Sequence, residues 1–394
     1  MVLRLVAPRA VRLRADPLAR RLARLDVEHW TRGIMLVPPR AEASHPPTPA
    51  SAPRASTPAE LSALASTAAL LRTPLLGVLS GVQALPIATF ASLGGGGVCI
   101  ALEDAALAVT APSHGLPLAY GESALLARLP RGLGAYLALT GSVLGAHELV
   151  HVGLARDHLN SRTLTRLTAA LAVADDLDVL GGLDVPPATA MVAVGAHAMS
   201  ASTPSPAELR LERRARARAL ALHCAMYGQA HEVSTPDGMA PRLAEIARLF
   251  DLGPRDAAGE VAKRLAGVPG EWAARALRAM ATASPLGLEL AARQLRAAAA
   301  APSLGECLRT EARAHAAFDA HVTDGAALAD EHERAATRGF GLQPWHVPFG
   351  AFARLDAPGA GAEPAGSPFA LAAQIEEGAR QAAATVDSWA LEAR

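Results

Sequence analysis

Polar residues that could do chemistry gather in a loop at residues 111–124. Ser113 and His114 are neighbours there, with Tyr120 and Glu122 a few positions later, among glycines and prolines. Adjacent side chains diverge in an extended or turn segment, so Ser113 and His114 are poorly placed as nucleophile and base. No G-x-S-x-G pattern surrounds the serine. The loop is therefore not expected to be a serine-hydrolase site.

A second group, His147, Glu148 and His151, forms an HExxH pattern. On a helix this spacing places both imidazoles on one face for zinc, with the glutamate as general base. The extended zinc motif needs a glycine three residues and a histidine six residues further on. Leu154 and Asp157 occupy those positions. We therefore predict no metal site.

The third group is the glycine run Gly94, Gly95, Gly96 and Gly97. It lacks both the GK[ST] of a phosphate loop and the G-x-G-x-x-G of a dinucleotide fold. A glycine run after a strand more safely indicates a tight turn or a close approach to the backbone. Its amide groups could still form an anion or oxyanion site at a helix N-terminus.

The elements around these groups predict an α/β fold. Apolar runs predict strands at 33–37, 75–79 and 106–110, and Pro58 is placed to begin a helix after an N-cap at Thr57. A short apolar helix is expected between the glycine run and the third strand. From residue 122 onward the pattern is almost entirely helical, ending in an amphipathic helix at 369–391 that should dock on a surface, its own or a partner's.

Charge is balanced over the chain, with 37 basic and 37 acidic residues, which argues against wholesale coating of nucleic acid or an anionic membrane. The first 25 residues differ, because they carry seven arginines and one acid, Asp16. This pattern is typical of a mitochondrial targeting segment and predicts the mitochondrial matrix, although a solvated basic helix or tail would look similar. No apolar run predicts a membrane span. Three dispersed cysteines argue against a disulfide framework or a cysteine-based zinc site.

In their order along the chain, several segments resemble the crotonase (enoyl-CoA hydratase/isomerase) superfamily, and within it the mitochondrial 3-hydroxyisobutyryl-CoA hydrolase branch. The segments are 75–82, 94–115, 125–161 and 242–315, the last containing Ser284-Pro285 and Arg293-Gln294-Leu295. The resemblance implies a crotonase-type superhelix of βα units with a helical C-terminal region. It divides the chain into a targeting or basic arm (1–33), a crotonase-like core (34–200) with a Pro-rich insertion (38–58), a helical region (201–354), and a linker with a C-terminal helix (355–394).

The resemblance also locates the expected active site. The family holds an acyl-CoA carbonyl between two backbone N–H donors, and carboxylates nearby move protons. The glycine run would supply one donor, but the motif for the other is missing before the Pro-rich insertion. The family's Glu and Asp fall on Ser113 and Gly121, and Glu122 lies one residue too late. On the same basis the HExxH falls on a helix that binds no metal.

These losses favour a non-catalytic protein with no cofactor, resembling the crotonase-like protein of the mitochondrial small ribosomal subunit. Protein subunits of a mitochondrial complex, ribosomal proteins first among them, are the expected partners. Arginine-rich segments, including residues 208–220, could contact ribosomal RNA. An accessory subunit of a respiratory complex fits nearly as well. The alternative is an active 3-hydroxyisobutyryl-CoA hydrolase, or a related acyl-CoA thioester hydrolase, that uses Glu122 and a glycine-run amide.

Overall fold

The computed structural model describes residues 2–6, 15–27, 31–36, 58–71, 73–80, 88–89, 91–92, 97–173, 242–253, 257–321 and 367–392. The chain forms two compact units. Unit 1 comprises Met1–Ala105 and Leu149–Val233, and unit 2 comprises Ala106–Glu148 and Ser234–Arg394. The units cross the predicted domain boundaries, because residues 106–148, predicted as part of the 34–200 core, belong with the C-terminal region.

Unit 1 contains a parallel sheet of five strands in the order β1-β2-β3-β4-β7. The strands are β1 (Val2–Val6), β2 (Thr31–Leu36), β3 (Leu75–Leu79), β4 (Val98–Leu102) and β7 (Asp157–Leu159). Every residue of β3 and β4 is buried, as expected for the centre of a parallel sheet covered on both faces. The prediction for 75–79 is confirmed residue for residue.

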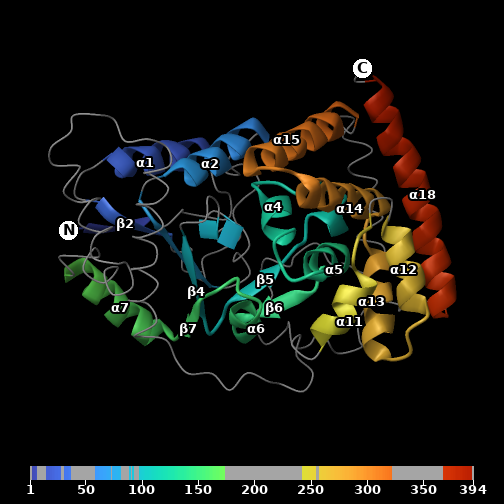
Figure 1. Cartoon of the computed structure of the whole chain (residues 1–394), viewed down its shortest axis with the longest axis horizontal. Coiled ribbons are helices and arrows are strands. Elements are labelled where there is room, and N and C mark those ends of the chain that lie inside the picture. Colours follow the sequence, from blue (N-terminus) through green and yellow to red (C-terminus); the bar gives the residue numbers. More distant parts are fainter. Residues whose placement is uncertain are drawn as a thin grey trace, which may run out of the picture. The chain divides into compact units, whose positions relative to one another are not determined.

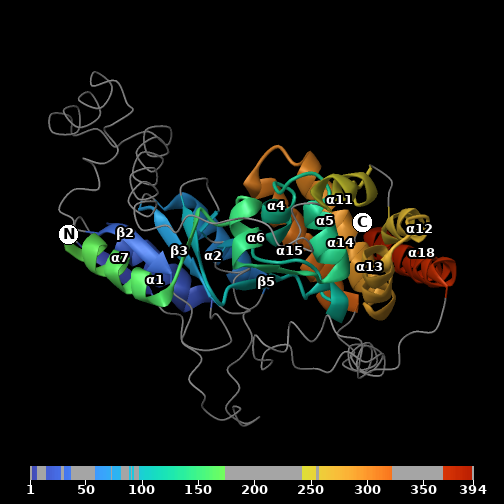
Figure 2. The same ribbon diagram turned by 90° about the horizontal axis from the view of Figure 1, so that it is seen from below.

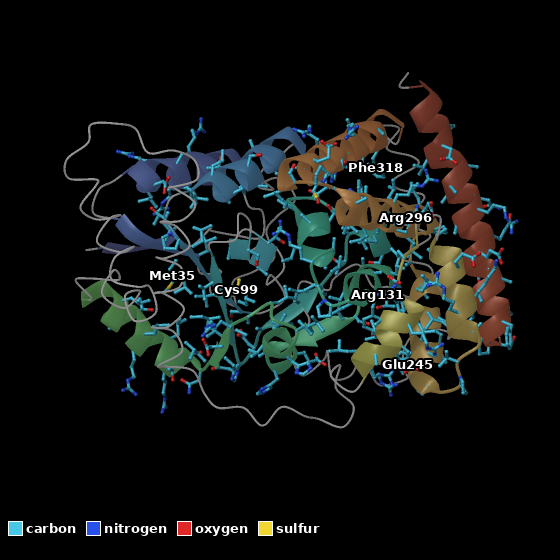
Figure 3. All side chains as sticks on the ribbon, in the orientation of Figure 1. Met35, Cys99, Arg131, Glu245, Arg296 and Phe318 are labelled. Carbon is cyan, nitrogen blue, oxygen red and sulfur yellow. The ribbon has the colours of Figure 1, made fainter. Side chains whose placement is uncertain are left out.

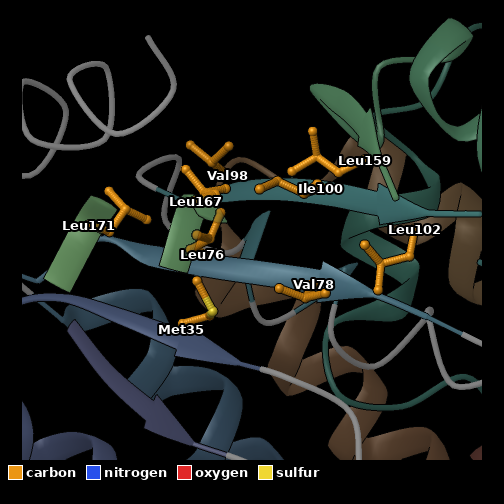
Figure 4. Close-up of a cluster of buried hydrophobic side chains, with 9 residues drawn as sticks. All are labelled: Met35, Leu76, Val78, Val98, Ile100, Leu102, Leu159, Leu167 and Leu171. Carbon is orange, nitrogen blue, oxygen red and sulfur yellow. The ribbon is translucent and has the colours of Figure 1, made fainter. Parts of the chain in front are cut away.

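Helices cover the two faces of this sheet. Alternate strand residues on one face pack against α7 (Ser161–Val173), and Figure 4 shows this cluster: Met35, Leu76, Val78, Val98, Ile100, Leu102, Leu159, Leu167 and Leu171. Helices α1 (Ala15–Val27) and α2 (Pro58–Leu70) lie on the other face and pack together (Figure 1). Each leucine buried in this way contributes about 1.5–3 kcal/mol.

The N-terminal residues predicted as a separate basic arm are part of unit 1. Strand β1 pairs in parallel with β2, and Leu22 and Leu25 on α1 are buried. The α1 and β2 elements are seen again in Figure 2. The periodicity of arginine and leucine that suggested an arm is therefore the pattern of a helix with one face on the core.

Two further predictions are corrected in unit 1. The short apolar helix expected after the glycine run is strand β4, because a short, fully buried apolar run has no periodicity that separates strand from helix. Strand β7 lies within the region predicted to be helical and adds to the sheet edge beside β4. Its three residues are too few to show an alternating pattern.

Unit 2 is mostly helical. Its elements are β5 (Ala106–Ala108), η4 (Pro112–His114), α4 (Glu122–Leu126), α5 (Leu133–Thr140), β6 (Val143–Gly145), α11 (Leu243–Leu249), α12 (Ala258–Ala266), α13 (Glu271–Thr282), α14 (Pro285–Ala300), α15 (Leu304–His321) and α18 (Pro368–Glu392). Strand β5 begins where predicted but pairs antiparallel with β6, outside the main sheet. The helix α6 (Ala146–His151) runs across the boundary between the units.

The C-terminal helix α18 docks on its own unit, against α12, α13 and α14 (Figure 1). Its buried stripe comprises Leu371, Ala372, Ile375, Ala379 and Ala382. The contact with α12 is close, since a Cβ on Gly259 would lie 3.0 Å from the Glu376 Cα. Lys263, the only lysine in the chain, pairs with Glu376 at 2.9 Å.

The Pro-rich insertion, the arginine-dense segment 208–220 and the linker at 355–366 lie outside the described residues. No helix among those described is both long and apolar enough to cross a membrane.

Candidate functional site

The segment 111–124 in unit 2 contains η4 and the first residues of α4. Its backbone makes sharp turns, with positive φ at Gly115 (80°), Tyr120 (60°) and Gly121 (89°). Tyr120 is the one non-glycine residue with positive φ in the described chain, and this conformation is strained for a residue with a Cβ. The two left-handed residues before Glu122 redirect the chain at the point where the family's acid is expected.

Ser113, which the resemblance predicts at the position of the family's glutamate, is hydrogen-bonded within the protein. Its Oγ donates to the Thr110 carbonyl oxygen at 2.7 Å, and its own carbonyl accepts from the Ser284 amide at 3.2 Å. The neighbouring Pro112 carbonyl touches α14 so closely that a Cβ on Gly287 would lie 1.9 Å from its oxygen. The serine and the backbone around it therefore serve the packing of η4 against α14.

Gly121, which the resemblance predicts at the position of the family's aspartate, is hydrogen-bonded to a carboxylate from a distant helix. Its amide donates to Glu311 Oε2 at 2.8 Å, and Ser123 donates to Glu311 Oε1 from its amide (2.9 Å) and its Oγ (2.5 Å). Glu311 lies on α15 and is 3% exposed. Burial raises the pKa of its carboxyl, and the three hydrogen bonds oppose that shift.

Glu122 is the other buried carboxyl of the loop and is 6% exposed. Its Oε2 accepts the Ala119 amide at 3.3 Å. Burial raises the pKa of Glu122 from its ordinary 4.5 to about 8; the bond from Ala119 opposes the shift, and the charge of Glu311 adds to it. At neutral pH this side chain is therefore mainly a neutral acid.

The same loop is held from α14 and α15 at Leu118. The Gln294 side chain accepts from the Leu118 amide at 2.8 Å and donates to its carbonyl at 2.9 Å, as a neighbouring strand would. The Leu118 carbonyl also lies 3.2 Å from His315 Nε2. Sequence reasoning noticed Gln294 as part of a signature but missed its contact, and it missed Glu311 and His315 entirely. No sequence signal marks these two residues, since each is one polar position on a long helix.

The glycine run is described at its last residue only. A Cβ on Gly97 would lie 1.6 Å from the Ala91 carbonyl oxygen, so no other residue fits there. This confirms the prediction of a close backbone approach in the run. Gly94, Gly95 and Gly96 lie outside the described residues.

The HExxH residues lie on α6, as predicted for a helix. Glu148 Oε2 accepts the Gly145 amide at 2.9 Å, which joins the glutamate to the last residue of β6, just before the helix. In the part of the chain that the structure describes, no three or more His, Cys, Asp or Glu residues are grouped to hold a metal ion. The glutamate is therefore placed as a helix-start acceptor, in the manner of a capping residue.

Hydrophobic and aromatic packing supports the helical region around the loop. Tyr136 on α5 stacks on Trp272 of α13 and meets the edge of Phe250, with ring centroids 5.8 and 5.1 Å apart. Phe318, labelled on α15 in Figure 3, packs with Leu290 of α14. The contact of Phe318 with Leu290 joins α15 to α14, the two helices from which Glu311 and Gln294 reach the loop.

The parallel sheet with its covering helices and the helical C-terminal region define a crotonase-type α/β fold. The chain belongs to the enoyl-CoA hydratase/isomerase family, whose pattern matches residues 93–326, more than half of its length. A comparison with curated protein sequences gives no match.

Two solved structures share the fold. A carnitinyl-CoA dehydratase from Mycobacterium thermoresistibile is 17% identical over 84% of this chain and 87% of its own, with a TM-score of 0.55. An enoyl-CoA hydratase from Rhodobacter sphaeroides 2.4.1 is 18% identical over 84% and 92%, with a TM-score of 0.52. At these identities the likeness concerns the fold alone.

Proposed function

We propose that this protein is a non-catalytic member of its family and a structural subunit of a large mitochondrial assembly. The small subunit of the mitochondrial ribosome is the first candidate, and a respiratory complex is the alternative assembly. One observation carries the proposal. Ser113 and Gly121 stand where the acid pair is expected, and the Ser113 hydroxyl and the Gly121 amide are both hydrogen-bonded within the protein.

Thioester hydrolysis needs a carboxylate with spare hydrogen-bonding capacity for water and two N–H donors aimed at the developing oxyanion. Glu311 offers little such capacity, since each of its oxygens already accepts from the loop. The sequence also lacks the motif for the first donor. Losing one oxyanion donor typically lowers the rate by about 10²–10³.

The second candidate function is hydrolysis of 3-hydroxyisobutyryl-CoA or a related acyl-CoA thioester, with Glu122 moving the proton. The observation that favours it is the burial of this carboxyl, which raises its pKa to about 8. An acid that stays neutral at pH 7 can donate a proton or a hydrogen bond to a reacting group. This candidate would use Glu122 and one glycine-run amide, without the second oxyanion donor.

An assay of thiol release from 3-hydroxyisobutyryl-CoA separates the two functions. We expect no turnover above background for the wild type, Glu122→Gln or Glu148→Gln. A wild-type turnover in the usual range of about 1–10³ s⁻¹, abolished by Glu122→Gln and kept by Glu148→Gln, would overturn the non-catalytic proposal. The two variants match because each replaces the carboxyl group of a glutamate that accepts an amide three residues upstream.

The proposed partners include RNA, and α1 offers a surface for it. Arg20, Arg21 and Arg24 are exposed on this helix, whereas Leu22 and Leu25 are buried. The apolar side of α1 is therefore used inside unit 1 and is not free to enter a lipid surface, which amphipathic membrane helices require. What α1 offers to a partner is positive charge, which suits a phosphate backbone.

Co-sedimentation of the native protein with mitochondrial small ribosomal subunits is the direct test of the assembly. For the RNA surface, we expect Arg21→Gln/Arg24→Gln to reduce the dependence of log K on log salt by about 1.4–1.8 in an RNA-binding titration. An unchanged slope would remove α1 from the RNA surface. Migration with a respiratory complex instead of ribosomes would redirect the proposal to that assembly.

We also propose the mitochondrial matrix as the location, on the basis of the arginine-rich N-terminus. Cleavage after residue 33 would remove β1, α1 and the first residues of β2 from unit 1. We therefore expect the mature protein to keep these residues. Mass spectrometry of the protein isolated from mitochondria measures this, and a mature chain that starts near residue 34 would contradict it.

A further inference from the structure

Two buried glutamates of unit 2 act on one short loop. Glu122 accepts from Ala119, and Glu311 accepts from Gly121 and Ser123, so both carboxyls bind amides of the segment Leu118–Ser123. We call these two side chains with that segment the glutamate latch. We propose that the glutamate latch is proton-dependent: the loop is held on α15 while Glu122 is neutral, and ionisation of Glu122 loosens it.

The geometry favours a latch over a second proton-transfer site. Glu311 binds three donors of the loop at 2.5–2.9 Å, and these bonds join α15 to the start of α4. A carboxylate that accepts several donors is stabilised in its charged form. Glu122 makes one longer bond, at 3.3 Å, and lies beside that charge. Within the latch, Glu311 is therefore the anchor and Glu122 the group that responds to pH.

Other titratable groups face the latch from each neighbouring element. Tyr120 lies in the loop itself, and burial raises the pKa of its phenol to about 12, with the charge of Glu122 adding to the shift. On α15, His315 contacts the Leu118 carbonyl, and the pKa of the Cys307 thiol is raised by burial and by Glu311. Arg128, after α4, acts on that thiol in the opposite sense. From α14 the contact is the uncharged Gln294.

The direction of the pH effect follows from proton linkage. In the closed loop the Glu122 carboxyl has a pKa of about 8, and in an opened, solvated loop it returns toward 4.5. Opening therefore releases a proton between these values, and the opening equilibrium rises about tenfold per pH unit in that window. The latch is tightest below about pH 5 and weakens until about pH 8. The raised pKa of Glu311 acts in the same direction.

The backbone supplies a further force for opening. Tyr120 is held at φ 60°, and this strain is released when the loop leaves its closed form. Glycine adopts the same conformation without cost. The strain does not depend on a proton, so it favours opening equally at every pH.

The test is hydrogen exchange of the full chain between pH 5.5 and 8.5, with protection factors corrected for intrinsic exchange. In the wild type, protection of the amides of Gly121 and Ser123 should fall about tenfold per pH unit up to pH 8. In Glu122→Gln the slope should fall by about one proton, and any slope that remains belongs to Glu311, whose pKa is also raised. Glu148→Gln is the matched control and should leave the wild-type slope intact at this loop.

His315→Gln is a second control, because it removes the imidazole that contacts the Leu118 carbonyl. The wild-type slope decides the proposal even where a variant fails to fold. Protection that is flat from pH 5.5 to 8, or a slope equal in the wild type and Glu122→Gln, would overturn it. The inference goes beyond the proposed function, because neither acyl-CoA turnover nor ribosome binding predicts how the protection of these amides changes with pH.

Discussion

Glu122 and Glu148 make the same local contact in two different surroundings. Each side chain accepts the amide three residues upstream at the start of a helix, at 3.3 Å for Glu122 and 2.9 Å for Glu148. Glu122 is buried beside a second carboxyl, whereas the contact of Glu148 is only partly buried. The same local contact therefore leaves Glu148 as an ordinary capping residue. In Glu122, burial and the neighbouring Glu311 raise the pKa of the carboxyl.

The largest effect is expected from replacing Glu311, which holds the loop on α15. Glu311→Gln replaces one carboxylate oxygen by an amide that points a donor at the donors of the loop. The loop amide and the new side-chain donor would both be buried without an acceptor, at about 2 kcal/mol each, so the free energy of unfolding should fall by about 4 kcal/mol. Urea unfolding measures this, and a loss of less than about 1 kcal/mol would mean that the loop is not held by Glu311.

The second prediction concerns the pH dependence of Glu122. Its folded-state pKa is raised, so the stability it contributes is complete below pH 4.5 and is lost as pH rises through about 8. Glu122→Gln should match the wild type at pH 5 and exceed it by about 3 kcal/mol at pH 8. Urea unfolding at both pH values tests this. If the wild type and Glu122→Gln differ in unfolding free energy by the same amount at pH 5 and pH 8, burial has not made Glu122 more sensitive to pH than Glu148.

The third prediction concerns Gln294, the residue of α14 that is hydrogen-bonded to the loop at Leu118. Gln294→Leu keeps the approximate size of the side chain but removes both bonds to the Leu118 backbone. The unpaired Leu118 amide should lower the free energy of unfolding by about 2 kcal/mol at any pH. A loss that grows with pH would show that Gln294 acts through Glu122 instead of holding Leu118 independently.

The smallest effect is expected at Glu148, the partly buried member of the comparison. Glu148→Gln keeps an acceptor for the Gly145 amide and removes a charge that is not deeply buried. The change in unfolding free energy should stay within about 0.5 kcal/mol from pH 5 to 8. A strong pH dependence here would mean that burial is not what separates the two glutamates.

Much of the fold could be predicted from the sequence. Strand 75–79 and the helix that begins at Pro58 have local signals, a buried apolar run and an N1 proline, and both are confirmed. Strands β4 and β7 could not be predicted in the same way, because three to five buried residues carry no distinctive period. The pairing of β1 with β2 depends on a contact between segments about 30 residues apart.

The sequence by itself determined the family and the absence of carboxylates at Ser113 and Gly121, because residue identity and order are local facts. Only the tertiary structure brought Glu311 to the loop from a position 190 residues beyond Gly121. Only the tertiary structure buried Glu122 beside it. A side chain's pKa and hydrogen-bond partners depend on which distant segments exclude water around it, and folding alone decides that.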